Sequence, residues 1–286
     1  MKKLIALILT LCLLLCGCGG EPQETTGTPD STHGWSGEGP EGILDEKETV
    51  TVYQVVSMTM RDTTGNMVLR REYSYDETGF CTEEYEETAA GELHVRRVNT
   101  PDGRGNIASS EISEFGGRNY EIRYTYDSSD RVILEEIWQE GVRVEYTEYT
   151  YDEHDNFLTL KQYYGDELMM DYTFRYSYDG NGNPLTVEES LFGQLICRIE
   201  YTYDDQGREL SCVSYMDSGE IQNRTESSWD GLTETREYFS GAETVSYMTN
   251  VSTYDESGNK IFEEIRSGGE LSSLTDYVYE PFEVKK

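Results

Sequence analysis

The feature that most constrains this chain is a Tyr-Asp pair that recurs about every 25 residues. Full pairs stand at Tyr75-Asp76, Tyr126-Asp127, Tyr151-Asp152, Tyr178-Asp179, Tyr203-Asp204 and Tyr254-Asp255. The intervals between successive Asp residues are 51, 25, 27, 25 and 51 residues, so two gaps are twice the period. Each long gap contains a degenerate copy, at Asp102 and at Trp229-Asp230. A fixed period of this length is typical of repeat proteins, in which each unit packs on its neighbours.

Each period contains two turns. The first reads Asp-x-x-Gly, as at residues 204–207, where Asp accepts backbone hydrogen bonds and Gly supplies a positive φ. Asp130 and Asp155 replace this Gly in two copies, which predicts slightly weaker turns there. The second turn follows 12 to 13 residues later, as at Gly193-Gln194. Counting from residue 62 to 270 gives 17 turns and therefore about 18 strands.

The segments between the turns alternate apolar and polar residues, most clearly from Leu195 to Tyr203. A period of two indicates strands with one buried face, and short turns join such strands as antiparallel hairpins. The predicted fold is therefore all-β, a long antiparallel meander of repeated hairpins. We expect the sheet to be curled or rolled, because 18 flat strands would be roughly 85 Å wide.

The Tyr-x-Tyr-Asp unit places two rings on one face of every second strand. Examples are Tyr124 with Tyr126 and Tyr201 with Tyr203. We interpret these rings mainly as core, because buried aromatic side chains dominate the packing of such sheets. An exposed aromatic platform that binds glycans is the alternative.

The pattern Gly-x(4–6)-Tyr-x-Tyr-Asp-x-x-Gly-(Asn/Arg) resembles the YD repeat of the RHS family. One copy runs from Gly193 to Arg208, with a slightly longer spacing of seven residues before Tyr201, and the resemblance extends over residues 50–282. It implies a coiled or rolled β meander. Large members of that family enclose a toxin, but this chain has about eight copies and no appended effector domain, so we do not expect toxin delivery.

The first residues have the pattern of a secretory signal peptide. A basic start is followed by the apolar run from Leu4 to Leu15, which is too short to span a bilayer. Leu15-Cys16-Gly17-Cys18 resembles the lipobox of bacterial lipoproteins, which implies cleavage before Cys18 and lipidation of Cys18. An ordinary cleaved signal peptide, with Cys18 unmodified, is the alternative.

Three segments follow from this reading. They are a lipoprotein signal peptide (1–17), the lipidated Cys18 with a flexible acidic tether (18–48), and a YD-repeat-like β domain (49–286). The tether is rich in Gly, Pro, Ser, Thr and Glu and has no strand or helix period.

The charge balance excludes one class of partner. The chain has 56 acidic and 23 basic residues, a formal net charge of −33. Removal of Lys2 and Lys3 with the signal peptide would make it −35. We therefore expect no nucleic-acid partner, and contact with an anionic membrane only through the anchor on Cys18.

Few residues suggest chemistry, and we predict no catalytic, cofactor-binding or metal-binding residue. His94 and His154 read as surface residues, with His154 in a turn. The pairs Glu83-Glu84, Glu86-Glu87 and Glu135-Glu136 read as solvated faces that also protect the edges of an open sheet. Residues 179–183 read as turn chemistry, with weak Ca²⁺ binding as the alternative.

Cys197 and Cys212 fall on adjacent strands of the hairpin that turns at Asp204. A simple register places them about two residues apart. Two small buried hydrophobic side chains are the main expectation, and a disulfide is the alternative.

The sequence therefore predicts a lipid-anchored protein on the extracytoplasmic face of a bacterial envelope. We expect it to be a non-enzymatic binding or scaffold module for another envelope macromolecule. The alternative is a carbohydrate-binding or carbohydrate-active protein that uses exposed Tyr and carboxylates.

Overall fold

The computed structural model describes residues 49–285. The predicted signal peptide, the lipidation site Cys18 and the tether lie outside these residues. The described part folds into 18 strands and contains no helix. The strands are β1 (Thr49–Arg61), β2 (Met67–Tyr75), β3 (Cys81–Thr88), β4 (Leu93–Pro101), β5 (Ile107–Glu114), β6 (Arg118–Tyr126), β7 (Val132–Gln139), β8 (Val142–Tyr151), β9 (Phe157–Tyr164), β10 (Glu167–Tyr178), β11 (Pro184–Leu191), β12 (Gln194–Tyr203), β13 (Glu209–Met216), β14 (Ile221–Asp230), β15 (Thr233–Ser240), β16 (Met248–Tyr254), β17 (Lys260–Ser267) and β18 (Glu270–Lys285).

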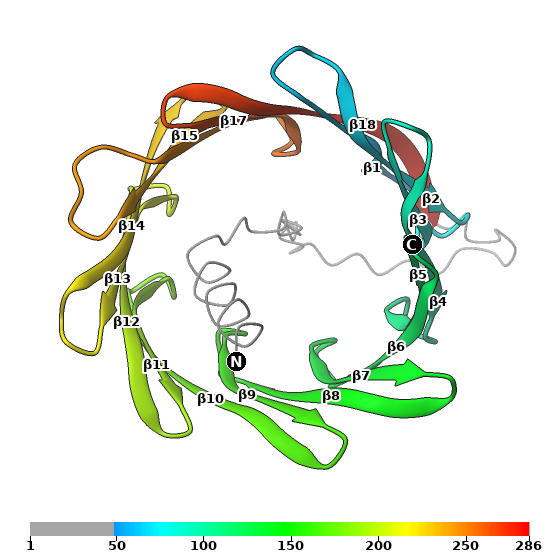
Figure 1. Ribbon diagram of the computed structural model, residues 1–286, viewed down its shortest axis with the longest axis horizontal. Coiled ribbons are helices and arrows are strands. Elements are labelled where there is room, and N and C mark those ends of the chain that lie inside the picture. The colour runs from blue at the N-terminus through cyan, green and yellow to red at the C-terminus, as the bar shows by residue number, and fades with distance from the viewer. Residues whose placement is uncertain (1–48, 286) are drawn as a thin grey trace, which may run out of the picture.

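The strands form one closed antiparallel barrel. Each strand pairs with its neighbours in sequence, and β18 pairs with β1 from Thr49 with Lys285 to Arg61 with Leu274. The predicted meander of about 18 strands and its rolling are thereby confirmed, and Figure 1 shows the ring. The expectation of an open sheet with edges to protect is wrong, because among the described strands both terminal ones are paired. Closure removes the edges altogether.

The turns gather at two rims of the barrel. We call the rim with the turns that follow the even-numbered strands the Asp rim, because its turns begin at or beside the repeat Asp. The turns that follow the odd-numbered strands form the outer rim. In Figure 1 the turns of the Asp rim lie inward of the strands, and the turns of the outer rim lie outward. The strand order places the start of β1 and the end of β18 together at the Asp rim.

The Asp side chain organises each repeat turn. Oδ1 of Asp204 accepts hydrogen bonds from the backbone N–H groups of Gln206 and Arg208, both at 2.9 Å. Its Oδ2 accepts one from Nε of Arg208 at 2.7 Å, and its carbonyl oxygen accepts the N–H of Gly207 at 3.0 Å. Backbone bonds to the same Asp oxygen recur in six other repeat turns, though not at the degenerate copy with Asp230, and in one turn of the outer rim, at Asp62, Asp76, Asp102, Asp127, Asp152, Asp179 and Asp255. The Asn or Arg that follows the Gly in the repeat pattern therefore has a structural role in those turns where its side chain binds the second carboxylate oxygen of the Asp.

The second Tyr of each unit ties one repeat to the preceding one. The hydroxyl of Tyr126 donates to the carbonyl of Ile107 at 2.9 Å, and that of Tyr151 donates to the carbonyl of Val132 at 2.6 Å. Each acceptor is the first residue of a strand in the preceding repeat. Within such a Tyr-Asp pair, the Tyr therefore hydrogen-bonds the preceding repeat and the Asp hydrogen-bonds its own turn.

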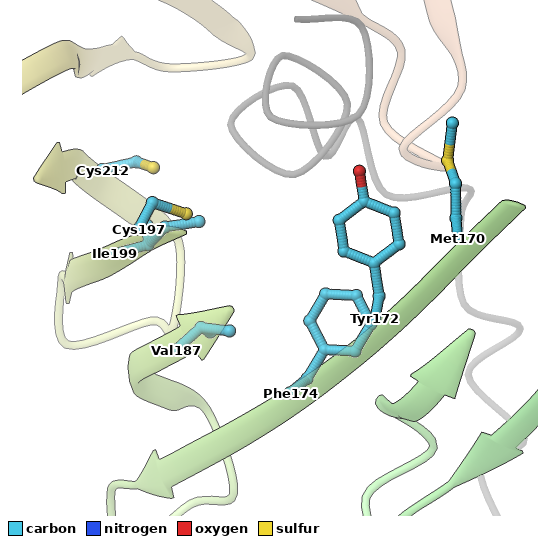
Figure 2. Packing of buried hydrophobic residues seen from close by; sticks show 7 residues of the cluster. All are labelled: Met170, Tyr172, Phe174, Val187, Cys197, Ile199 and Cys212. Atoms are coloured by element: carbon cyan, nitrogen blue, oxygen red, sulfur yellow. The ribbon is translucent and has the colours of Figure 1, made fainter. Parts of the chain in front are cut away.

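The main cluster of buried apolar side chains lies on the inner face of the barrel. Figure 2 shows its seven members pointing inward from adjacent strands: Met170, Tyr172, Phe174, Val187, Cys197, Ile199 and Cys212. Residues that pair across adjacent strands lie on the same face of a sheet. The strand pairing therefore identifies which residues of the other strands face inward. Tyr172 pairs with Leu160, which pairs with Tyr149. The prediction that the paired Tyr rings share one face is confirmed, but most of them are half-buried rather than fully buried.

The outer face carries a row of ion pairs between neighbouring positions. Arg96 contacts Glu83 at 2.6 Å, Arg123 contacts Glu121 at 2.8 Å, and Arg198 contacts Glu200 at 2.6 Å. Exposed pairs of this kind add little to stability but keep the surface hydrated. The outer face of the described barrel therefore meets water along these strands.

The expected offset of Cys197 and Cys212 is wrong. Cys197 pairs with Met216 and Cys212 pairs with Tyr201, so the two thiols are four register positions apart rather than two. The cause is the Asp204 turn, which closes on Tyr203 and Glu209 and is followed by a bulge. Four positions on adjacent strands separate the two Cα atoms by roughly 14 Å. That is too far for a disulfide between them, and both side chains are buried as expected.

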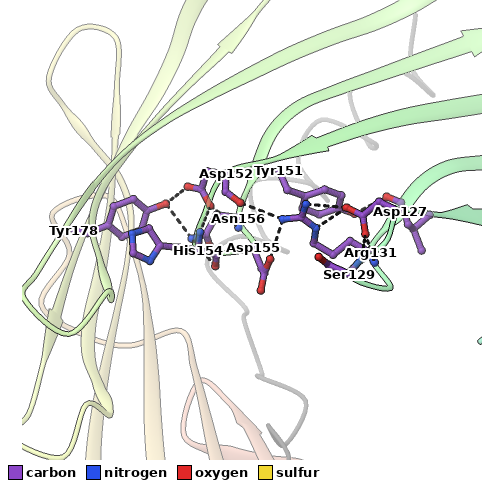
Figure 3. A network of polar contacts seen from close by, with 10 residues as sticks. Asp127, Ser129, Arg131, Tyr151, Asp152, His154, Asp155, Asn156 and Tyr178 are labelled. Carbon is purple, nitrogen blue, oxygen red and sulfur yellow. Dashed lines mark hydrogen bonds and ion pairs between the residues drawn. The ribbon is translucent and has the colours of Figure 1, made fainter.

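Asp130 and Asp155, which replace the turn Gly, link neighbouring turns. Both have a positive φ, 62° and 64°, as the pattern predicts. Each also accepts an ion pair from the turn before it: Arg104 contacts Asp130 at 2.7 Å, and Arg131 contacts Asp155 at 2.9 Å. Figure 3 shows the second of these links. These ion pairs between neighbouring turns partly compensate for the expected weakness of the two turns, and the sequence pattern did not reveal them.

The balance of these two effects is testable at Asp155. Its side chain is 74% exposed, so its ion pair with Arg131 contributes well under 1 kcal/mol, whereas a left-handed backbone costs a non-glycine residue about 1 kcal/mol. Asp155→Gly is therefore expected to raise the free energy of unfolding by about 0.5 kcal/mol in urea denaturation. Asp155→Asn is the matched control, because Asn tolerates the positive φ but lacks the charge. Lower stability of the Gly variant would mean that the ion pair outweighs the strain.

Candidate functional site

Charged side chains line the inner face of the barrel as well as the outer one. Because side chains alternate between the faces of a strand, one member of each predicted Glu pair points inward. Glu84, Glu86 and Glu135 line the inner wall, and Glu86 is only 5% exposed. The prediction that these pairs form solvated faces is therefore wrong for the inward members. We take the inner wall as the candidate functional site.

The first depression in this wall lies across β2 to β6 and has a volume of about 270 Å³. Its lining residues are Arg71, Glu84, Glu86, Val95, Arg97, Ile112, Glu114 and Tyr120. The volume is at the low end for pockets that hold small organic ligands.

Arg71 and Glu86 form the most buried ion pair of this depression. Nε of Arg71 donates to Oε2 of Glu86 at 2.9 Å, and Nη2 donates to the same oxygen at 2.5 Å. His94 contributes from the same region, with Nε2 3.5 Å from Oε1 of Glu86. The prediction that His94 is a surface residue is confirmed, since its side chain is exposed, and the structure adds its contact with Glu86.

The remaining polar groups of the first depression are paired more loosely. Nε of Arg97 lies 3.7 Å from Oε1 of Glu84, which is longer than a hydrogen bond. The hydroxyl of Tyr120 donates to Glu114 at 2.9 Å. Arg97 also hydrogen-bonds the hydroxyl of Tyr124. Because a guanidinium has five N–H donors, Arg97 still retains donor capacity, and Glu84 retains acceptor capacity. A ligand that both donates and accepts hydrogen bonds would match this wall.

The second depression lies across β7 to β10 and has a volume of about 170 Å³. Its lining residues are Glu135, Glu145, Thr147, Tyr149, Leu160, Gln162, Met170 and Tyr172. Nε2 of Gln162 donates to Glu145 at 2.6 Å. Burial raises the pKa of Glu135, and the negative charge of Glu145 raises it further. No basic residue is among these lining residues, so the second depression is acidic and aromatic.

A third charged group lies on the strands from β13 to β15. The guanidinium of Arg236 is 2.9 Å from Glu234 and 3.7 Å from Glu209, and all three side chains are less than one-fifth exposed. Burial raises the pKa of Glu209. Sequence reasoning missed this group. Its signal was present in the alternation, because Glu234 and Arg236 share the parity of the half-buried Tyr238.

The turn that contains His154 adds a polar network at the Asp rim (Figure 3). The imidazole of His154 lies 4.1 Å from the ring of Tyr178, measured between ring centres. The hydroxyl of Tyr178 donates to Asp152 and accepts a hydrogen bond from Asn156 at 3.0 Å. The prediction that His154 lies in a turn is confirmed, and its ring packs on a repeat Tyr.

Asp179, the candidate Ca²⁺ residue, is used by its turn. Its Oδ1 accepts the N–H groups of Asn181 and Asn183, and its Oδ2 accepts the side-chain amide of Asn183 at 2.9 Å. These bonds also lower the pKa of Asp179. The turn interpretation accounts for both carboxylate oxygens.

Comparisons with known proteins are weak. No family model and no curated protein matches the chain. Among solved structures, a TcdB2-TccC3 complex matches with a TM-score of 0.28 and 11% identity, and a Photorhabdus luminescens Tc holotoxin pore with 0.26 and 13%. The matches cover 73% of this chain but span only 15% and 17% of those chains. A porin-like protein from Bacteroides uniformis matches with a TM-score of 0.40 and 11% identity, covering 79% of this chain and 98% of that one.

These TM-scores and identities are too low to support an inference about fold or function, so the fold rests on the strand order of the barrel itself. Within residues 49–285, no helix is long and apolar enough to cross a membrane.

The raised pKa of Glu135 gives a testable pH dependence. Its carboxyl binds a proton more tightly in the folded chain than in the unfolded one, so stability rises as pH falls from 7 through the raised pKa. The gain ends at the ordinary Glu value of about 4.5. The turn Asp residues have lowered pKa values, so their contribution is lost only at still lower pH.

We expect Glu135→Gln to unfold at a higher urea concentration than the natural chain at pH 7, with a smaller difference at pH 5. Glu148→Gln is the control, because Glu148 is exposed on the outer face. Equal pH profiles for Glu135→Gln and the natural chain would contradict the raised pKa of the half-buried Glu135 carboxyl.

Proposed function

We propose that this protein is a lipid-anchored, extracytoplasmic binding module of the bacterial envelope, without enzymatic activity. In this proposal it is a YD-repeat-type barrel held by acyl chains on Cys18. Its inner wall binds another envelope macromolecule. The lipobox-like sequence supports the location, and the architecture supports a scaffold whose repeats continue without interruption by a separate catalytic unit.

One observation carries the choice of the inner wall as the binding surface. On the outer face, several Arg and Glu side chains pair at hydrogen-bond distance, and the longer pair of Arg175 with Glu188 (4.0 Å) is open to water. In the first inner depression, the Arg97 to Glu84 contact is longer and leaves donors and acceptors available beside an apolar floor of Val95 and Ile112. Depressions with a few converging polar groups on an apolar base are typical of binding sites.

A glycan is the second candidate for the bound macromolecule, and the position of the aromatic rings favours it. The Tyr pairs that the sequence offered as an outward platform line the inner wall, where they are half-exposed. Sugar hydroxyls both donate and accept hydrogen bonds, which matches the combination of Arg97, Glu84 and Glu114 in the first depression. A carbohydrate-active form of this proposal would use Glu135 and Glu145, which share the second depression.

A glycan array probed with the complete mature chain tests where binding occurs. We expect Arg97→Ala to weaken retention of a bound glycan by about tenfold, because a charged hydrogen bond is lost. Arg198→Ala removes the same side chain from the outer face and is expected to leave retention unchanged. An equal loss in both variants would place the binding surface outside the inner wall, and retention of a single envelope protein instead of glycans would favour the scaffold role.

The anchor has its own test. Cys18→Ala is expected to release the protein from the membrane fraction of the producing bacterium, because no residue remains to carry the acyl chains. Cys16→Ala changes a neighbouring thiol in the same segment and is expected to leave the protein in the membrane fraction. If the Cys18→Ala protein stays in the membrane fraction, the lipoprotein assignment is wrong.

A further inference from the structure

Large apolar side chains stand exposed on six consecutive hairpin tips of the outer rim. They lie at the turns from β5–β6 to β15–β16, at least one in each hairpin, and are between 42% and 78% exposed; Tyr247 is a second one in the β15–β16 turn. The six residues are Phe115, Val142, Tyr164, Phe192, Met216 and Val245. Single exposed apolar residues are common on proteins, but a run of them along one rim marks an interaction surface.

The Asp rim differs in both charge and exposure. Its turns carry the repeat Asp and further acids, such as Glu153 and Asp205. Leu232 is the exposed large apolar side chain within one of its turns, at 47%. Other exposed apolar residues near this rim lie on the strands rather than in the turns. Tyr53 on β1 and Val278 on β18 are 57% and 49% exposed, and the rest are less exposed: Ile133, Leu158, Leu185, Leu210 and Ile261.

None of the six apolar turns contains a basic residue. The turns at 115–117 and 192–193 have no charged residue, and the other four carry only acids: Glu140, Asp166, Asp217 with Glu220, and Glu243. In Figure 1 the outer-rim hairpins lie outward of the ring as separate projections. Separate apolar tips suit a soft surface, which each tip can enter independently, better than a rigid partner that would need a matching series of pockets.

The chain outside the described residues permits this rim to reach a membrane. β1 begins at the Asp rim, and residues 18–48 precede it. These 31 residues can extend to about 100 Å, whereas a strand of nine residues spans about 30 Å. An anchor on Cys18 therefore allows the opposite rim to face the bilayer, and it holds the barrel close to that surface.

We propose that the six apolar tips of the outer rim dip into the interface of a zwitterionic lipid bilayer. Cys18 acylation, which belongs to the proposed function, brings the barrel to the membrane, and the tips then orient it. The inner wall opens toward the bilayer at this rim. The excess of acidic residues, which gives the chain from residue 18 a net charge of −35, sets the lipid preference, because an anionic surface repels the chain and a zwitterionic one does not.

The test uses the complete mature chain from residue 18 with Cys18→Ser, so that no acyl chain contributes. We expect it to co-sediment with phosphatidylcholine vesicles and to bind less well when phosphatidylserine is included. The triple variant Phe115→Ser, Tyr164→Ser, Phe192→Asn is expected to bind at least about tenfold more weakly, since each tip loses its apolar contact. Asn suits position 192, whose φ is 51°.

Leu232→Ser is the matched control, since it removes an exposed apolar side chain from the Asp rim, and its vesicle binding should be unchanged. Far-ultraviolet circular dichroism of every variant verifies the β fold. Failure of the mature chain to bind phosphatidylcholine, or equal binding by the triple variant, would overturn the proposal. So would a dimer in sedimentation velocity that the triple variant abolishes, because the tips would then bury against a second copy. None of these outcomes depends on Cys18. If the vesicle experiment contradicts membrane binding by the tips, the proposed lipid anchor on Cys18 is unaffected and is tested separately by Cys18→Ala.

Discussion

The barrel depends on a carboxylate that binds two backbone N–H groups of its own turn. One Asp, such as Asp204, thereby stabilises the turn and fixes the register of the two strands that the turn connects. The neighbouring Tyr hydroxyl then binds the preceding repeat, as Tyr126 binds Ile107. Two adjacent residues thus fix both the turn and the stacking of hairpins, which is why a chain with few fully buried side chains still forms a continuous wall.

Much of this architecture follows from the sequence because its determinants are local. The period of 25, the Asp-x-x-Gly turns and the alternation between them specify the number of strands, their antiparallel order and the shared face of the Tyr rings. Closure is not local. Whether β18 meets β1 depends on the summed curvature of all the strands, and no single repeat shows this. The bulge at Leu210, beside the pair of Tyr203 and Glu209, is also hidden, which is why the expected offset of Cys197 and Cys212 was wrong.

The candidate site was harder to predict than the fold. In an open sheet, Glu86 and Glu135 would be interpreted as solvated, since acidic residues usually lie on the surface. A closed wall of this size has an inner face that is too long to be filled by apolar side chains alone. Polar residues at inward positions, such as Arg97 and Arg236, are then tolerated where they find partners. The alternation identified which residues share a face, but only closure reveals that this face is concave.

The meeting of β1 and β18 has a consequence for how such a chain can vary. In an open array, one more repeat lengthens the molecule and leaves the other units as they were. In a ring, one more hairpin changes the circumference and therefore the curvature that every other strand must adopt. The start of β1 and the end of β18 lie side by side at one rim, so the barrel could be joined there and opened elsewhere. A circular permutant opened at an outer-rim turn and joined across the Asp rim would keep every strand pair, so the order of the repeats along the chain is less important than their number.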